Sequence, residues 1–533
     1  MEWVRLGARR HWVFGVVLVG AIAVRVLVML AFRPIMWFGG DSASYLATGL
    51  RLVPDPSRVG GYGFMLWVLR PLHSFAVVAA VQHVMGLAIG WLSYLLARRY
   101  GLPGWVATLA AVPVFFDAYE LQLESDAVPD VPFGFIVFVG LYLLLRSPAE
   151  RRPSRTVPAA FLVGATAIVW PVGLALLAVL LVTLVIRRSG WLALAAAVLA
   201  GAVPVAAYAA WFDLHEHQFS LTRSDGVYLW SRTMSFANCA VIKPPADERA
   251  LCPPAGPRMA ASLYIWDGNS PLLAMPGGRF SARTNALAQN FALRAIEAQP
   301  GGYLTAVGHD VALSFYWDRP VHPDAGIVDR YQFADATTAW VPAGMGALGG
   351  GTVAGDQAAY AGGHPAPTRA VQPFASWLVS YQRYVYLRGT LLGVILLGAL
   401  AAIIARWRSG GRTGGRNEAG GSSDGRGPGR PREAALPWAF AMTILLVPPL
   451  TVDFDLRYLV PAMPAACLAA ALAFAPRRAG DSAGASGAAG DAGAAGQRTC
   501  TTSPAATATS GPDDTRTSSL PSGSTPAAEP ESS

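Results

Sequence analysis

Charged residues are scarce in this chain of 533 amino acids. Asp, Glu, Lys and Arg make up only 14% of it, whereas 53% is hydrophobic and the mean hydropathy is +0.38. A chain with so few charges is too apolar for an ordinary soluble protein. We therefore predict an all-α polytopic membrane protein.

Cysteine is also scarce, and no internal repeat is evident. None of the four cysteines lies in a CxxC pattern or at a Cys/His spacing typical of a metal site. His215 and His217 form an HxH pair with too few further ligands, so we interpret them as interfacial polar residues. The absence of a repeat counts against transporter folds built from repeated halves.

Apolar runs near the roughly 20 residues needed to cross a bilayer recur along the chain. The stretch 157–186 is either one long helix or two helices that meet at Trp170-Pro171. Counting two helices places twenty arginines in short inward loops and five in outward loops, which satisfies the positive-inside rule. This gives ten spans and cytoplasmic termini. The spans are 12–32, 75–97, 103–118, 128–145, 157–171, 172–186, 190–211, 385–405, 436–452 and 458–475.

The topology divides the chain into four regions. Residues 1–211 hold seven spans, and residues 385–478 hold the last three with an Arg-rich cytoplasmic loop at 406–435. Residues 479–533 contain no aromatic residue and are predicted to be a disordered cytoplasmic tail. The net charge of +8 comes largely from inward arginines beside anionic lipid, so it is no evidence for nucleic-acid binding.

Residues 212–384 form an outward domain, which we predict to be α+β or irregular. Within it, residues 283–298 have the apolar spacing of an amphipathic helix. Cys239 and Cys252 both lie in this compartment, where oxidation permits a disulfide between them.

Asp41 directly follows the first predicted span, in the sequence GGDSASY. An outward carboxylate at this place is a candidate catalytic base. The alternative is a helix N-cap, because Asp at the start of a helix accepts hydrogen bonds from free backbone N–H groups. Further along the same loop, residues 64–72 are apolar but too short to span, which predicts a helix lying in the interface.

A second cluster of carboxylates lies between the third and fourth predicted spans. Charges so near hydrocarbon are costly, so such a cluster is more often functional than incidental. We favour Glu124 or Asp126 as a functional residue. The alternative is a solvated loop in which Ser125 or Asp126 caps the next helix. The four acids of the cluster are Asp117, Glu120, Glu124 and Asp126.

Arg457 is the only arginine at the outer end of the last two predicted spans. Its guanidinium could bind a phosphate through two parallel hydrogen bonds. The alternative is a salt bridge to Asp453 or Asp455. Arg25 lies inside the first span, where its charge needs a partner or must extend to the interface.

Together these segments resemble the GT-C superfamily of polytopic glycosyltransferases, in particular bacterial members related to protein mannosyltransferases and to the aminoarabinose transferase of lipid A. The resemblance covers about residues 12–211 and 436–475. The chain departs from it at Ser42, where the mannosyltransferases carry a second acid, and at Trp170, where many relatives carry an arginine nearby. The matching motifs are Asp41 with Tyr45, Gly61-Tyr62-Gly63 leading to Val81-Gln82-His83-Val84-Met85-Gly86, Glu124-Ser125-Asp126, and Arg457-Tyr458-Leu459-Val460-Pro461.

The resemblance implies transfer of a sugar from a polyprenyl-phosphate donor to an acceptor outside the plasma membrane, with inversion at the anomeric carbon. Asp41 would deprotonate the acceptor, and we expect partial burial to raise the pKa of Asp41. Glu124 or Asp126 would bind acceptor hydroxyls or a divalent cation. The positions assigned to substrate or phosphate binding are Tyr45, Arg58, Tyr62, Gln82, Arg457 and Tyr458.

Two other functions are compatible with a polytopic chain. A transporter or flippase of lipid-linked precursors would need ionisable residues near the bilayer midplane and broken helices facing them. A noncatalytic scaffold for envelope assembly would use the outward domain to bind glycan, but it leaves the acidic cluster unexplained.

Overall fold

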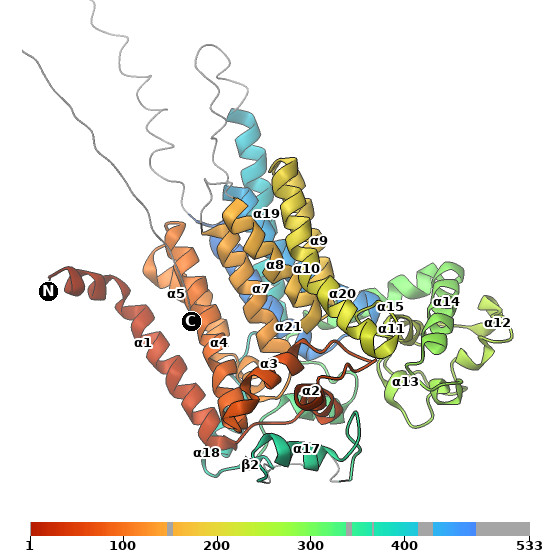
Figure 1. Cartoon of the computed structure of the whole chain (residues 1–533). Coiled ribbons are helices and arrows are strands. Elements are labelled where there is room, and N and C mark those ends of the chain that lie inside the picture. Colours follow the sequence, from red (N-terminus) through yellow and green to blue (C-terminus); the bar gives the residue numbers. More distant parts are fainter. Residues whose placement is uncertain (1, 147–152, 337–343, 365–366, 414–429, 476–533) are drawn as a thin grey trace, which may run out of the picture. The chain divides into compact units, whose positions relative to one another are not determined.

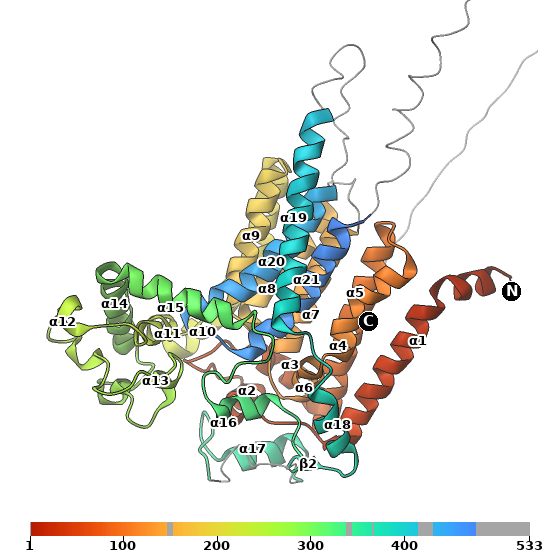
Figure 2. The same ribbon diagram turned by 180° about the vertical axis from the view of Figure 1, so that it is seen from behind.

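The computed structural model describes residues 2–146, 153–336, 344–364, 367–413 and 430–475. It is mostly helical, at 71%, with almost no strand. Each of the ten predicted spans coincides with a helix (Figure 1; Figure 2). These helices are α1 (Glu2–Ala31), α4 (Phe75–Arg99), α5 (Gly104–Phe116), α7 (Asp130–Leu145), α8 (Pro153–Val169), α9 (Val172–Ile186), α10 (Trp191–Glu216), α19 (Gly389–Thr413), α20 (Arg430–Thr451) and α21 (Leu459–Ala473).

Helix length separates these ten segments into two groups. Six of the described helices are long and apolar enough to cross a membrane, namely those in α1, α4, α10, α19, α20 and the stretch Leu456–Ala473 that contains α21. α5 and α6 (Ala118–Ser125) are bent by 51° and make a seventh candidate if they form one broken span. α7, α8 and α9 are shorter, at 16, 17 and 15 residues. The chain is therefore a multi-pass membrane protein by composition, and the count of ten crossings stays a prediction.

The stretch 157–186 divides at Trp170-Pro171, so the interpretation as two helices is confirmed. α8 ends at Val169, and the Trp170 N–H still donates to the Thr166 carbonyl at 2.8 Å. Pro171 has no N–H group and cannot continue the hydrogen-bond ladder of α8. α8 packs against α7 and α10, and α9 packs against α20.

α21 is the most enclosed of the candidate spans. Of its apolar window 89% is buried, compared with 22% for α1. It contacts α4, α5, α7, α19 and α20. Its sequence, LVPAMPAACLAAALA, is rich in alanine, and small residues allow helices to approach closely. Its packed position fixes the turn just before it, which carries Arg457.

Two short helices, α2 (Gly39–Arg51) and α3 (Gly61–Leu69), pack against each other at one end of the helix bundle (Figure 1). α3 continues into a 3-10 turn, η1 (Arg70–Leu72). α3 and η1 together cover the apolar segment predicted at residues 64–72. Trp67 and Val68 on this segment are 48% and 65% exposed.

Residues 212–384 consist of helices, most of them short, joined by irregular stretches, so of the two predicted alternatives the α+β one is wrong. The strands of the described chain are two residues long: β1 (Phe32–Arg33) pairs antiparallel with β2 (Arg369–Ala370). The helical elements here are α11 (Asp225–Thr233), α12 (Cys239–Ile242), η2 (Arg249–Leu251), α13 (Leu263–Trp266), η3 (Pro271–Ala274), α14 (Ala282–Ala298), α15 (Pro300–Leu313), α16 (Ala325–Val328), η4 (Asp329–Tyr331), α17 (Val353–Tyr360) and α18 (Phe374–Gln382).

α14 is the amphipathic helix predicted at 283–298. The Ser281 side chain caps it by accepting a hydrogen bond from the Thr284 N–H, and Phe291 on its buried face packs in a cluster with Trp230 of α11. Cys239 and Cys252 form the disulfide that their shared compartment permits but the sequence alone left open, and it closes a loop with a sequence separation of 13. α11 to α15 lie on one side of the bundle end, and α17 lies below α2 (Figure 2).

Residues 1–478 form one compact unit, so residues 212–384 do not separate from the helices that flank them. The predicted tail at 479–533 lies outside the described residues. The predicted loop at 406–435 is shorter than expected, because α19 continues to Thr413 and α20 begins at Arg430. Residues 414–429 between them lie outside the described part.

Candidate active site

Asp41 occupies the first turn of α2 without capping it. α2 begins at Gly39, and Ser42 accepts a hydrogen bond at its Oγ from the Phe38 N–H at 2.8 Å. The interpretation of Asp41 as an N-cap is therefore wrong. Its carboxylate is free to point away from its own helix, and 29% of the side chain is exposed.

Two guanidinium groups hold the Asp41 carboxylate, one at each oxygen. Arg58 Nη1 donates to Asp41 Oδ1 at 2.5 Å, and Arg457 Nη1 donates to Oδ2 at 2.9 Å. Arg58 comes from the loop between α2 and α3, and Arg457 comes from η5 (Leu456–Tyr458) before α21. Both arginine side chains are largely buried, at 13% and 9% exposed. The structure thus brings together three residues that the sequence analysis selected.

A second carboxylate, Asp130, completes this group. Asp130 begins α7, is fully buried, and accepts two hydrogen bonds from Arg457, from Nε at 2.9 Å and from Nη2 at 2.6 Å. The predicted salt bridge of Arg457 to Asp453 or Asp455 is wrong. Asp455 instead accepts a hydrogen bond from Tyr331 Oη at 2.7 Å. We call Asp41, Arg58, Arg457 and Asp130 the Asp41 cluster.

Aromatic rings flank both arginines of the Asp41 cluster. The guanidinium of Arg58 lies 5.9 Å from the centre of the Tyr45 ring and 5.5 Å from that of Trp266. The guanidinium of Arg457 lies 5.3 Å from the Phe38 ring and 5.9 Å from the Trp170 ring. Such contacts favour the cation and hold its plane in place.

Tyr458 and Trp170 form one wall beside Arg457, with ring centres 4.9 Å apart. The Trp170 ring supplies a face for the Arg457 guanidinium. Tyr458 was predicted as a binding residue and lies next to the cluster, through this ring contact and its place beside Arg457 in η5.

The pKa of Asp41 lies below its ordinary value. Burial is the largest influence and raises it, but the charges of Arg58 and Arg457, with their hydrogen bonds, together outweigh burial. The expectation that burial would make Asp41 more basic is therefore wrong for this state. Asp41 is an ionised, weakly basic carboxylate while both arginines contact it.

Gln82 and Tyr62 hold the end of α6 and the residues after it, and they do not hydrogen-bond Asp41. Gln82 Nε2 donates to the carbonyls of Glu124 and Asp126, at 2.9 and 2.8 Å, and Tyr62 Oη donates to Gln82 Oε1 at 2.7 Å. The Asp126 side chain is buried and accepts a hydrogen bond from Gln122 at 2.5 Å. Burial raises the pKa of Asp126, and its charge interacts with Asp130 and Arg457, so it borders the Asp41 cluster.

Glu124 belongs to a different, fully enclosed group of charges. Its Oε1 accepts from Arg25 Nη2 at 2.5 Å, and its Oε2 contacts His83 Nδ1 at 2.6 Å. Of the two alternatives predicted for Arg25, a charge partner or extension to the interface, the structure shows the charge partner. A side chain at Gly86 would place its Cβ 1.7 Å from Glu124 Oε1, so only glycine leaves room for this carboxylate. We call Arg25, His83 and Glu124 the Arg25 cluster.

Glu124 and Asp126 do not fit the divalent cation that the family resemblance allows. Both Glu124 oxygens are already bound by Arg25 and His83, and Gln122 binds Asp126. Among the residues that the structure describes, the grouping of His, Cys, Asp or Glu atoms suited to an ion lies elsewhere, at Asp310, His322 and Asp453. His215 contacts Trp211 one turn back in α10, through Nδ1 to its carbonyl at 2.9 Å and through the two rings, whose centres are 5.3 Å apart, in keeping with its interpretation as an interfacial residue.

Sequence analysis missed Asp130 and Trp266 as members of the site. Asp130 had one usable signal, because it is the last acid before an apolar segment in the loop that carries Glu124 and Asp126. Trp266 had none, since it lies in a short helix of the outward segment whose placement no motif predicted.

Comparisons with known proteins identify no relative of this chain. No family model matches it, and neither a curated protein nor a solved structure is significantly similar. Its function must therefore be argued from the Asp41 cluster itself.

Proposed function

We propose that this protein is a membrane glycosyltransferase that moves a sugar from a polyprenyl-phosphate donor to an acceptor, with inversion. The observation that carries the proposal is the Asp41 carboxylate held between Arg58 and Arg457 with one edge exposed. The transfer needs a base for the acceptor hydroxyl and positive charge for the donor phosphate. A carboxylate next to two guanidiniums, which can bind phosphate, would supply both.

In the proposed reaction, an acceptor hydroxyl oxygen attacks the anomeric carbon of the donor sugar. The bond from this carbon to the phosphate oxygen breaks, and the lipid phosphate leaves as an anion. Asp41 accepts the proton of the hydroxyl as the carbon–oxygen bond forms. Arg58 and Arg457 stabilise the negative charge that develops on the phosphate, so no general acid is required.

The donor itself would prepare Asp41 for this role. A bound phosphate competes with the Asp41 carboxylate for Arg58 and Arg457, because both are anions of similar hydrogen-bonding geometry. Loss of either contact removes an influence that lowers the pKa of Asp41, while the burial that raises it remains. Asp41 thus becomes a stronger base when a donor is present.

The surroundings of Arg58 supply a surface for a sugar ring. Trp266 is 44% exposed and lies next to the Arg58 guanidinium. Partly exposed aromatic faces are common in the walls of ligand sites, where they pack against apolar parts of a ligand. We assign Trp266 to the acceptor or donor sugar on this ground.

The test is sugar transfer in membranes that contain radiolabelled polyprenyl-phosphate sugars. We expect Asp41→Asn to lower the transfer rate by about 10²–10⁴-fold, the usual contribution of a general base. Asp335→Asn is the matched control, since Asp335 is exposed and its carboxylate accepts a hydrogen bond from Ser376. Unchanged transfer by Asp41→Asn at a normal protein level would refute the proposal.

A carrier or flippase of lipid-linked precursors is a second candidate, and the Arg25 cluster favours it. Arg25 lies within the candidate span His11–Ala31, and Glu124 lies in α6, the second half of the bent pair with α5. Buried ionisable residues next to a broken helix are typical of transport pathways.

The two candidates predict opposite results for one pair of variants. If the protein is a transferase, Asp41→Asn abolishes sugar transfer, whereas Glu124→Gln lowers it only as far as the protein level falls. If it is a carrier, vesicles containing Glu124→Gln fail to move a fluorescent polyprenyl-phosphate sugar across the bilayer, whereas Asp41→Asn moves it at the wild-type rate.

A further inference from the structure

Three potential metal ligands converge outside the Asp41 cluster. They are Asp310 on α15, His322 in the loop that follows α15, and Asp453 in the turn between α20 and α21. One ligand atom from each lies within 4.8 Å of the other two, and His322 Nε2 is 2.7 Å from Asp453 Oδ1. Asp310 and Asp453 are buried, and the His322 side chain is 16% exposed.

Neighbouring groups orient these ligands. Asp453 Oδ2 accepts hydrogen bonds from both the N–H and the Oγ of Ser262, at 3.0 and 3.1 Å. Asp310 Oδ2 is paired with Arg232. Partners of this kind fix the carboxylates of metal sites. The other oxygens, Asp310 Oδ1 and Asp453 Oδ1, lie 3.2 Å from His309 Nδ1 and 2.7 Å from His322 Nε2, and an ion would take the place of these two contacts. One imidazole and two carboxylates match the three protein ligands of a zinc site that keeps open coordination positions.

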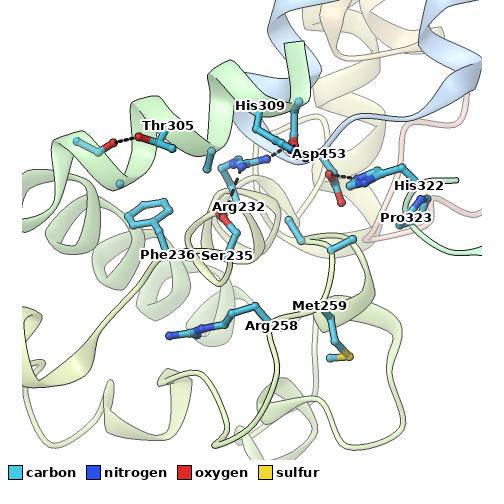
Figure 3. Close-up of a pocket in the computed structure, with 16 residues that line it drawn as sticks. Arg232, Ser235, Phe236, Arg258, Met259, Thr305, His309, His322, Pro323 and Asp453 are labelled. Atoms are coloured by element: carbon cyan, nitrogen blue, oxygen red, sulfur yellow. Dashed lines mark hydrogen bonds and ion pairs between the residues drawn. The ribbon is translucent and has the colours of Figure 1, made fainter. Parts of the chain in front are cut away.

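A cavity of about 610 Å³ adjoins the three ligands (Figure 3). Its polar lining includes Arg232, Arg258 and His309 as well as the three ligands. Arg258 is occupied by the carbonyls of Met234 and Ala237 at the end of α11. The Arg232 guanidinium donates through Nη1 to Asp310 and through Nη2 to the Ser235 hydroxyl, which leaves its Nε.

Arg232 brings an unsatisfied donor to the lining of this cavity. Its side chain is 2% exposed and lines the cavity, yet its Nε has no hydrogen-bond partner among the described residues. A buried N–H without an acceptor costs about 1–3 kcal/mol, so it is rarely left unsatisfied. An oxygen-rich anion in the cavity would supply the missing acceptor.

We propose that Asp310, His322 and Asp453 bind a divalent cation of the zinc class, and that this cation and Arg232 together bind an anionic ligand of the phosphate type in the cavity. The charges agree with this assignment. The cation and Arg232 carry three positive charges against the two negative charges of Asp310 and Asp453, which leaves an excess that attracts an anion. This site does not depend on the proposed transferase activity.

Zinc content of the purified full-length protein tests the cation. After chelation and reloading with zinc, we expect about one ion per chain by mass spectrometry, the stoichiometry of a single three-ligand site. Asp453→Asn and His322→Gln are each expected to lose it. Asp318→Asn is the control, because Asp318 is 79% exposed and pairs with Arg388 away from the cavity. Should one of the two ligand variants not fold, the other decides.

Inorganic phosphate tests the anion. Calorimetry of the wild-type protein should show phosphate binding that weakens at least about tenfold after zinc removal, a change of about 1.4 kcal/mol. Arg232→Lys keeps the charge but lacks the planar donor group, and should weaken phosphate binding in the zinc-loaded protein.

Two results would overturn the proposal. One is a zinc content in Asp453→Asn and His322→Gln equal to that of the wild type. The other is that no part of the phosphate binding depends on zinc and on Arg232. Asp41→Asn should bind zinc as the wild type does, because Asp41 contacts none of the three ligands. Failure of the transferase proposal and failure of this one therefore give different results.

Discussion

Asp130→Asn is expected to lower the free energy of unfolding by about 3 kcal/mol. Both Asp130 oxygens accept hydrogen bonds from Arg457, and the Asp130 side chain is fully buried. Breaking a buried ion pair from one side costs about 3–5 kcal/mol, because the other charge stays desolvated without its partner. We take the lower end of this range because Arg457 keeps its contact with Asp41 at 2.9 Å.

Asp318→Asn makes the same chemical change at an exposed pair. The Asp318 side chain is 79% exposed, and such pairs contribute about 0–1 kcal/mol because water solvates both charges and ions screen them. Both variants would be unfolded by denaturant in detergent micelles and followed by tryptophan fluorescence. A loss for Asp130→Asn that equals the loss for Asp318→Asn would refute the reasoning.

The double variant Asp130→Asn/Arg457→Gln, compared with the two single variants, measures the interaction free energy between Asp130 and Arg457. Replacing both partners removes the unpaired buried charge, so the double variant should lose less than the sum of the two single losses. Strict additivity would mean that Asp130 and Arg457 act independently despite their two hydrogen bonds.

Two further predictions concern the Arg25 cluster and the protonation of Asp41. Gly86→Ala should destabilise the protein by about 3–5 kcal/mol in the same unfolding assay, because the new Cβ would displace Glu124 from Arg25. Gly398→Ala is the control and should be neutral, because Gly398 lies in α19 with open space around it. Equal losses of stability in the two variants would contradict the prediction. Burial raises the pKa of Asp41, but the charges of Arg58 and Arg457 outweigh it. The acid limb of the kcat/KM profile for transfer should therefore lie below about pH 4. The acid limb of the kcat profile should lie at higher pH, because bound phosphate competes with Asp41 for both arginines. If the acid limbs of the kcat and kcat/KM profiles coincide, the proposed competition by phosphate is refuted. The lowered pKa also means that ionised Asp41 stabilises the folded protein above its unfolded-state pKa of about 4, and that this stabilisation is lost as the pH falls through its folded-state pKa. Asp41→Asn should not show this loss.

Local patterns predicted much of the helical framework. The apolar runs matched helices because a chain in lipid must satisfy its own backbone hydrogen bonds. The break at Trp170-Pro171 followed from arginine placement, whereas the compartment that this placement implied only permitted the disulfide. The predicted topology puts Asp41, Arg58 and Arg457 at the same end of the helices, but it did not predict that both arginines contact Asp41.

The partners of these charges could not be read from the sequence. Arg457 has two acids within four positions, yet Asp455 caps η5 by accepting from the Arg457 N–H, and the Arg457 side chain extends to Asp130 on α7. Glu124 pairs with Arg25 at a sequence separation of 99. Which face of α6 meets α1 depends on the bend between α5 and α6, and no local pattern encodes that bend.

The contact between Asp41 and Arg457 can form only late in biosynthesis, because the two residues are far apart in the sequence. Arg58 follows Asp41 by 17 positions and leaves the ribosome soon after it, whereas Arg457 follows by 416. At about 5–20 residues per second, the second guanidinium arrives about 20–80 s later. A growing chain therefore carries an Asp41 neutralised by one arginine only, and Asp130 waits in α7 without its partner until the last helix enters the membrane.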